Sequence, residues 1–141
     1  MSAKPDPPFT SAAEIAELVR LFESCQLPGE RWTHRAHLAV AATYLRAYPL
    51  PEATDRARAH IRRYNESRGN HAGYHETITV LFMRLVAREL KTDPADLAGF
   101  VNGLAGRFAV DGLYAHYSKD RLWSAEARAG FVEPDLRPLD F

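Results

Sequence analysis

The stretch Ile78-Thr79-Val80-Leu81-Phe82-Met83-Arg84-Leu85-Val86-Ala87 is apolar on nearly every side of a helix, with Thr79 and Arg84 as the exceptions. A helix that is apolar almost all round is normally the buried central helix of a domain. We therefore predict a central helix over residues 74–91, with the remaining helices packed around it.

Four further segments carry apolar residues at the spacing of an amphipathic helix. Ser11 and Thr33 have the side chains of N-caps, and each stands directly before such a segment. Asp93-Pro94 is predicted to begin another helix, because proline is favoured at the first helical position. The predicted helices around the central one are residues 11–25, 33–48, 52–64 and 93–108.

The C-terminal region is less regular. We expect a short helical piece at residues 113–117 and another at 125–129, capped by Ser124. From Phe131 the chain carries Pro134 and Pro138, so the tail should be extended, and its apolar residues should pack on the body. The prediction is an all-α, single-domain antiparallel helical bundle over residues 11–141, with about five main helices and an extended C-terminal tail. Residues 1–10 are expected to be a flexible N-terminal lead.

Composition narrows the functional classes. The chain has 141 residues, 46% of them hydrophobic, with 18 basic and 18 acidic side chains. This balance argues against a nucleic-acid binder, which needs a basic surplus. No apolar run approaches the roughly 20 residues of a membrane span, and the N-terminus carries no hydrophobic signal segment, so we expect a soluble cytoplasmic protein. The single cysteine, Cys25, has no partner for an intrachain disulfide and is expected to be a buried, inert thiol.

Three histidines are expected to face the interior. His34 and His37 are three residues apart and extend the apolar stripe of the second helix, while His75 extends that of the central helix. If both helices run in the same direction, the three rings meet at one end of the bundle. They would then supply three nitrogens to a divalent metal such as zinc and leave one position open for water.

Two side chains next to His75 are candidate catalytic groups. Glu76 lies on the flank of the central helix and should be covered, so it needs a polar partner. It is a candidate to orient a ligand or to take a proton from bound water, and Tyr74 is a candidate proton donor. His71 is an alternative metal ligand, although Gly69 and Gly73 argue against a helix there. The competing interpretation makes the histidines ordinary core groups that are hydrogen-bonded to carbonyls.

Other polar and aromatic residues near this cluster have structural and functional interpretations. Trp32 precedes the Thr33 cap and is expected to form a hydrophobic staple, with substrate stacking as the alternative. Asn65 either caps its helix or reaches into the site. Arg31, Arg35 and Arg68 either bind an anionic substrate or are solvated, and His60 and His116 are expected to be packing or surface residues.

The motifs Thr33-His34-Arg35-Ala36-His37-Leu38 and Gly73-Tyr74-His75-Glu76-Thr77 resemble those of a group of small, uncharacterised bacterial proteins. The segment Phe131–Leu136 is also similar in that group. The resemblance covers most of the chain and implies a shared fold without implying a reaction. A looser likeness, by analogy only, is to DinB-like four-helix proteins that hold a metal with three histidines in a different order and spacing.

Three functions from different classes fit these observations. The first is a small metal-dependent enzyme, a hydrolase or lyase, acting on a small polar metabolite through His34, His37, His75 and Glu76. The second is a non-catalytic module that binds a small ligand in the same pocket. The third is a structural or interaction protein with core histidines, whose partner is a second copy or another chain.

Overall fold

Five long α-helices make up the body of the molecule in the computed structural model, which describes residues 4–91 and 93–141. The other helical elements are two 3-10 segments and two short α-helices. The described residues contain no strand. In chain order the elements are α1 (Ala12–Glu23), η1 (Gly29–Arg31), α2 (His34–Ala47), α3 (Leu50–Ser67), α4 (Glu76–Glu89), α5 (Leu97–Arg107), η2 (Val110–Ala115), α6 (Lys119–Leu122) and α7 (Ala125–Ala129).

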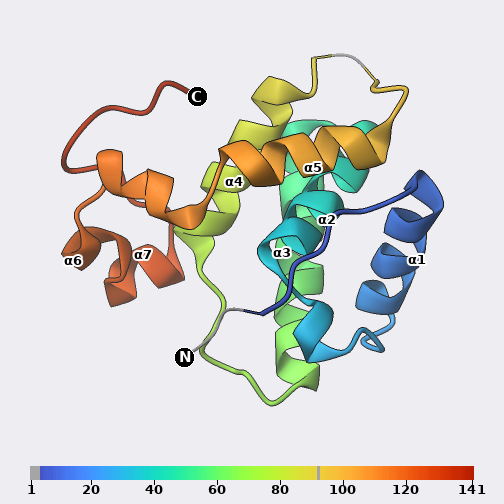
Figure 1. The fold of residues 1–141 in the computed structure, drawn as a ribbon. Helices are drawn as coiled ribbons and strands as arrows, with labels where there is room; N and C mark the ends of the chain where they lie inside the picture. The colour runs from blue at the N-terminus through green and yellow to red at the C-terminus, as the bar shows by residue number, and fades with distance from the viewer. Residues whose placement is uncertain (1–3, 92) are drawn as a thin grey trace.

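Helices α1 to α4 alternate in direction along the chain, and α5 crosses at one end of this group (Figure 1). The central position is held by α2, which contacts α1, α3, α4 and α5, and not by α4 as predicted; α4 contacts α2, α3 and α7. The α4 residues Leu81, Met83, Leu85 and Val86 are buried, as the apolar stretch predicts. The all-α bundle expected from the sequence is the fold that is found.

The predicted N-caps of the first two helices are confirmed. The Ser11 hydroxyl accepts a hydrogen bond from the backbone N–H of Glu14, and the Thr33 hydroxyl accepts one from Ala36. Each cap satisfies one of the amide groups that have no partner inside the helix. The first helix ends at Glu23, two residues before the predicted end. Cys25 is half-buried just beyond it, with a left-handed φ of 61°.

The predicted starts of α4 and α5 are wrong by two or more residues. His75 lies outside α4 as its N-cap, and its Nδ1 accepts a hydrogen bond from the N–H of Ile78 at 3.1 Å. Helix α5 begins after Asp96, whose carboxylate accepts from the N–H of Gly99 at 2.9 Å, and not at Asp93-Pro94. In both cases a side chain that can accept a hydrogen bond decides where the helix begins.

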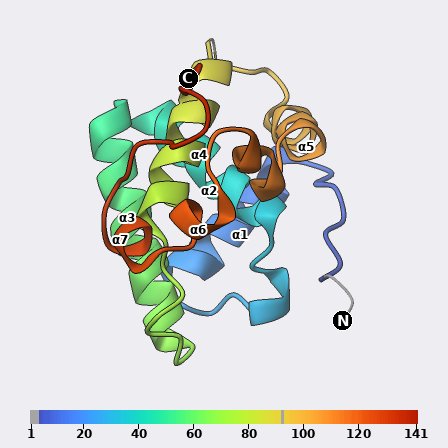
Figure 2. The ribbon, with the colours of Figure 1, turned by 90° about the vertical axis from the view of Figure 1, so that its left-hand side faces the viewer.

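The C-terminal region packs on α4 around a second group of buried residues (Figure 2). The Thr77 hydroxyl lies 2.8 Å from the carbonyl of Ala127 and 2.9 Å from that of Gly130. The Tyr117 hydroxyl donates to the carbonyl of Val132 at 2.6 Å. The tail from residue 131 is non-helical, as predicted, and Val132 is buried while Leu136 is 60% exposed.

The N-terminal segment lies along α2 and α5. The backbone of Phe9 exchanges two hydrogen bonds with the side-chain amide of Asn102, and Asp6 accepts one from the Thr33 hydroxyl at 2.7 Å. The expected flexibility of residues 1–10 stays a prediction, and residues 1–3 lie outside the described part of the chain. Among the helices that the structure describes, none has both the length and the apolar character needed to cross a bilayer.

Candidate functional site

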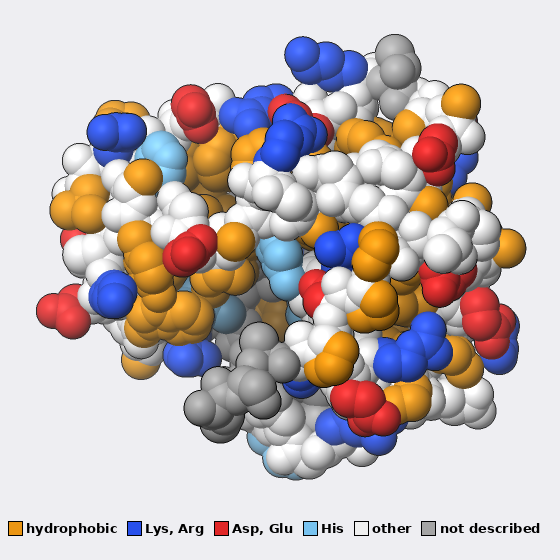
Figure 3. Space-filling view, in the orientation of Figure 1, with side chains coloured by type: hydrophobic (Ala, Val, Ile, Leu, Met, Phe, Trp, Pro, Cys, Tyr) orange, Lys and Arg blue, Asp and Glu red, His pale blue; other side chains and the backbone are white. Residues whose placement is uncertain are grey.

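A cavity of about 420 Å³ lies between α2, α3, α4 and the N-terminal segment. Figure 3 shows histidine side chains in a hollow near the middle of one face of the molecule. Most of the cavity wall is apolar, and the bulkiest side chains in it are Trp32, Leu38, Ile61, Ile78, Phe82 and Met83. The polar side chains that reach it are Lys4, Asp6, Thr33, His34, His37 and Thr79.

Small side chains on facing helices leave the space for this cavity. Ala41 of α2 and Ala57 of α3 both line it, and these two helices pack on one another. Both residues are almost fully buried. A volume of this size falls in the range of small-molecule binding sites.

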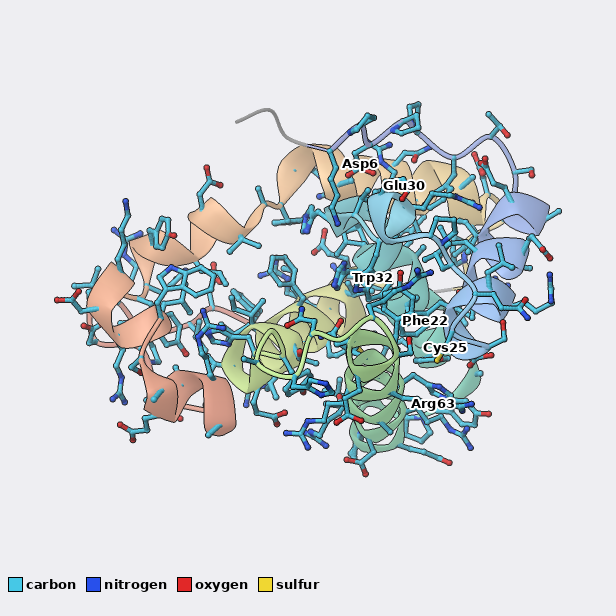
Figure 4. The ribbon with its side chains drawn as sticks, turned by 90° about the horizontal axis from the view of Figure 1, so that it is seen from below. Asp6, Phe22, Cys25, Glu30, Trp32 and Arg63 are labelled. Atoms are coloured by element: carbon cyan, nitrogen blue, oxygen red, sulfur yellow. The ribbon has the colours of Figure 1, made fainter. Side chains whose placement is uncertain are left out.

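One wall of the cavity is a stack of three rings. Trp32 is sandwiched between Phe22, with ring centroids 4.5 Å apart, and His37, with centroids 3.8 Å apart. Trp32 precedes the Thr33 cap, and His37 is the fourth residue of α2, so this is the N′–N4 staple predicted from the sequence. Figure 4 shows Trp32 beside Phe22 of α1. The staple therefore fixes one face of the His37 ring.

His37 is held as a neutral ring with a defined tautomer. Its Nδ1 lies 2.6 Å from the carbonyl of Thr33, an acceptor only, so Nδ1 carries the proton and Nε2 carries the lone pair. The protein atoms around the ring lower the pKa of His37 below its ordinary value, against the opposing effect of the bond to Thr33. The ring is nevertheless exposed to solvent where it lines the cavity. At pH 7 it therefore offers a neutral hydrogen-bond acceptor.

His34 lines the same cavity, and a hydrogen bond to a backbone carbonyl also holds its ring. Its Nε2 lies 2.6 Å from the carbonyl of Phe108 and must donate to it, which leaves Nδ1 as the acceptor. The ring packs edge-on against Phe82 of α4, with centroids 5.3 Å apart. The two histidines of the Thr-His-x-x-His-Leu motif thus share one site.

The other polar groups at the cavity are paired within the protein. Asp6 accepts hydrogen bonds from the Thr33 hydroxyl and from the backbone N–H of Arg35 at the start of α2, where a carboxylate is favoured by the helix dipole. Lys4 donates to the carbonyls of Gly29 and Trp32, at 2.9 and 3.3 Å. The charged groups at the rim of the cavity, Asp6 and Lys4, therefore already have hydrogen-bond partners within the protein.

His75 does not join the other two histidines. Its Nε2 bonds to the carbonyl of Leu122 at 2.6 Å, its Nδ1 caps α4, and its ring lies edge-on to Trp123. The contact of His34 is with Phe82, which is seven residues and roughly 10 Å further along α4. Burial is the main cause that lowers the pKa of His75. The His75 ring and the His34 ring therefore lie at positions about two helical turns apart along α4, where the sequence predicted that they would be close together.

Within residues 4–91 and 93–141, no group of three or more His, Cys, Asp or Glu side chains is arranged to hold a metal ion. The predicted ligands His34, His37 and His75 are therefore not brought together as one set in this conformation. Each ring instead bonds to a backbone carbonyl. This is the bonding expected if the histidines are ordinary core groups. Zinc binding stays a prediction.

Glu76 is covered and has the polar partner that its position requires. The guanidinium of Arg58 from α3 binds both carboxylate oxygens, at 2.8 and 2.6 Å, and the Tyr74 hydroxyl donates to Oε1 at 2.6 Å. The bond from Arg58 is the largest cause that lowers the pKa of Glu76, and burial raises that of Tyr74 to about 12. Both shifts oppose proton transfer near pH 7, and a catalytic role for either group stays a prediction.

The pairing of Arg58 with Glu76 was not predicted from the sequence. Two of the arginines considered as anion ligands are also engaged inside the protein. Arg35 donates to Asn102 at 2.8 Å, and Arg68 donates to the carbonyl of Leu27 and lies over the Tyr64 ring. His71 and Asn65 lie away from the apolar cavity and line a second, polar hollow.

No family model, no curated protein and no solved structure matches this chain.

Proposed function

We propose that the apolar cavity binds a small, mostly apolar molecule that carries one hydrogen-bond donor. The observation that carries this proposal is the neutral His37 ring, whose Nε2 is, among the described residues, an unpaired acceptor in a mostly apolar cavity. This is the small-ligand module of the three functions considered from the sequence.

The size and the lining of the cavity support an organic ligand. About 420 Å³ holds a molecule with one or two fused rings, and contact with Ile78, Phe82 and Met83 favours an apolar body. Trp32 offers an aromatic edge beside His37. A ligand with a strongly charged body would lose its hydration there without gaining a partner.

The free acceptors set the polarity of the ligand. Among the described residues, Nε2 of His37 and Nδ1 of His34 have no hydrogen-bond partner, while the Thr33 and Thr79 hydroxyls are already bonded. A ligand hydroxyl or N–H satisfies an acceptor, whereas an ether of the same shape leaves it unpaired. The donor therefore determines specificity, and the apolar body supplies most of the affinity.

We expect 2-naphthol to bind the wild-type protein about fivefold more tightly than 2-methoxynaphthalene. A hydrogen bond adds about 1 kcal/mol to binding, which corresponds to that ratio. In His37→Phe, which keeps a ring to stack on Trp32 but removes its acceptor, the preference should fall well below fivefold. Isothermal titration calorimetry at pH 7 measures both affinities.

His116→Phe is the matched control, because His116 lies among the C-terminal residues and does not line the cavity. This variant should keep the fivefold preference. Equal binding of both compounds to the wild type, or a preserved preference in His37→Phe, would contradict the role of His37. Failure of both compounds to bind at millimolar concentration would contradict the proposal as a whole.

Chelation separates this function from the metal-dependent hydrolase or lyase. Protein purified without a histidine tag and treated with EDTA should bind 2-naphthol with an affinity within a factor of two of that of untreated protein. This is expected because the proposed contacts come from His37 and apolar side chains alone. Loss of binding after chelation, restored by zinc, would instead favour the metal-dependent enzyme.

A further inference from the structure

A second hollow of about 450 Å³ lies between the C-terminal end of α3, the loop that precedes α4, and α7. It shares no residue with the apolar cavity. Its lining is mainly polar, and the side chains that matter for its chemistry are Arg62, Asn65, Asn70, His71 and Arg128. Glu66 is the one carboxylate in the lining.

Two arginines in this hollow lie over aromatic rings. The guanidinium carbon of Arg62 lies 4.5 Å from the centre of the Tyr74 ring, and that of Arg128 lies 5.4 Å from the Trp123 ring. Within the part of the chain that the structure describes, neither makes an ion pair, whereas Arg58 and Arg121 nearby do. A guanidinium can contact a ring through its face and keep its in-plane N–H groups for an anion.

The nearest strong anion on α4 is not available to Arg62. Both oxygens of Glu76 bind Arg58, one turn earlier on α3, and Oε1 also accepts from the Tyr74 hydroxyl. The charge of Glu76 is therefore balanced, and that of Arg62 is not. Two arginines against the single carboxylate of Glu66 leave the hollow with an excess of positive charge.

The loop shape places amide groups beside these arginines. The backbone N–H of Asn70 donates to the carbonyl of Asn65 at 2.9 Å, which joins the loop to the end of α3. Gly73 packs against the Asn70 side chain, and a Cβ at Gly73 would lie only 2.2 Å from Asn70 Nδ2. On the other side, Ala125 and Ala129 of α7 are small and leave the hollow open.

We propose that this hollow binds the phosphate monoester of a small polar molecule, such as a sugar phosphate. Arg62 and Arg128 are the ligands of the phosphoryl group, since the planar guanidinium matches phosphate oxygens in bidentate geometry. The volume of about 450 Å³ exceeds that of a phosphate ion, and Asn65 and Asn70 supply donors and acceptors for hydroxyl groups. The site is independent of the apolar cavity and of its proposed ligand.

The test titrates the full-length protein with glucose 6-phosphate, inorganic phosphate and glucose, and follows the side-chain NMR signals of His71 and Trp123. We expect glucose 6-phosphate to bind more tightly than inorganic phosphate, and glucose not to bind. Arg62→Gln and Arg128→Gln should each weaken glucose 6-phosphate binding about tenfold, because each removes a charge-assisted contact. Arg62→Lys and Arg128→Lys, which keep the charge but lose the bidentate geometry, should give a smaller loss.

Arg63→Gln is the matched control for the charge change. Arg63 is on α3 next to Arg62, does not line the hollow, and is on the side of the helix towards Cys25 (Figure 4). This variant should bind glucose 6-phosphate within a factor of two of the wild type. Equal losses in Arg63→Gln and Arg62→Gln would overturn the proposal in favour of general charge attraction.

Two other outcomes would also overturn the proposal. If inorganic phosphate binds as tightly as glucose 6-phosphate, the site does not recognise the sugar part of the ligand. If the lysine and glutamine variants are folded by circular dichroism and bind glucose 6-phosphate as tightly as the wild type, the arginines do not bind the phosphoryl group. The affinity for 2-naphthol should be the same in Arg62→Gln and the wild type, which separates the two sites.

Discussion

Replacing Arg58 by alanine is expected to lower the free energy of unfolding by about 3 kcal/mol. Glu76 is only 9% exposed, and Arg58 supplies two of the three hydrogen bonds that its carboxylate accepts from side chains. Without Arg58, Glu76 is left as a covered charge, and among the described residues the Tyr74 hydroxyl is its one remaining side-chain partner. An unpaired charge in such a place is far more costly than the pair itself is stabilising. Urea denaturation at pH 7 measures the loss.

Arg56→Ala is the control on the same helix. Arg56 faces Glu52 at 3.7 Å, with side chains 43% and 54% exposed, and lies over the Tyr48 ring. An exposed ion pair and a surface cation–π contact together contribute no more than about 1 kcal/mol. Similar losses in Arg56→Ala and Arg58→Ala would show that burial of Glu76 has no special role.

The pH dependence of the Arg58→Ala effect has a definite sign. The bond from Arg58 holds the pKa of Glu76 below its value in the unfolded chain. The contribution of the pair is therefore fully present above the unfolded pKa of about 4.3 and is lost as the pH falls through the folded pKa. The difference in stability between wild type and Arg58→Ala should accordingly shrink as the pH falls.

The long helices were predictable because their signals are local. The apolar stretch at Ile78–Ala87 and the caps Ser11, Thr33 and Ser124 act within one or two turns of chain. The staple between Trp32 and His37 is local for the same reason, and the role of Trp32 in it was predicted, although His37 was not named as its partner.

The start of α4 was not predictable from periodicity, because His75 continues the apolar stripe in sequence but not in space. Its Nδ1 competes with the helix by accepting from the N–H of Ile78, which turns the backbone of His75 out of the helix. Histidine is not among the preferred N-caps, so the sequence carries no strong signal for it. This shift and the packing of His34 on Phe82 together separate the rings that were expected to meet.

The candidate sites depend on contacts between distant residues. Arg58 and Glu76 are 18 residues apart and meet only because α3 and α4 pack in one particular register. The apolar cavity needs Ala41 and Ala57 on facing helices, and its rim needs Asp6 to reach the start of α2. The spacing of residues along one helix contains no information about the register between two helices.

Phe22→Ala is expected to lower the free energy of unfolding by about 4 kcal/mol, the middle of the range for a buried aromatic residue. Phe22 is 1% exposed, and its ring contacts Trp32 at 4.5 Å and Tyr64 at 5.5 Å between centroids. Removing it leaves a cavity behind Trp32 that the fixed helices α2 and α3 cannot fill. Thermal and urea denaturation measure the loss, and Phe22→Leu, which fills most of the space, should lose less.

The same change is expected to weaken 2-naphthol binding in the fraction of protein that stays folded, because Trp32 is then held on one face only. Leu122→Ala is the matched control, since Leu122 is fully buried in the C-terminal group and does not line the apolar cavity. It should cost about 2–5 kcal/mol of stability but keep the wild-type affinity for 2-naphthol. If both variants lose affinity in proportion to stability, the wall formed by Phe22, Trp32 and His37 does not position the ligand. Loss of affinity in Phe22→Ala alone identifies that stack as the part of the core that shapes the site.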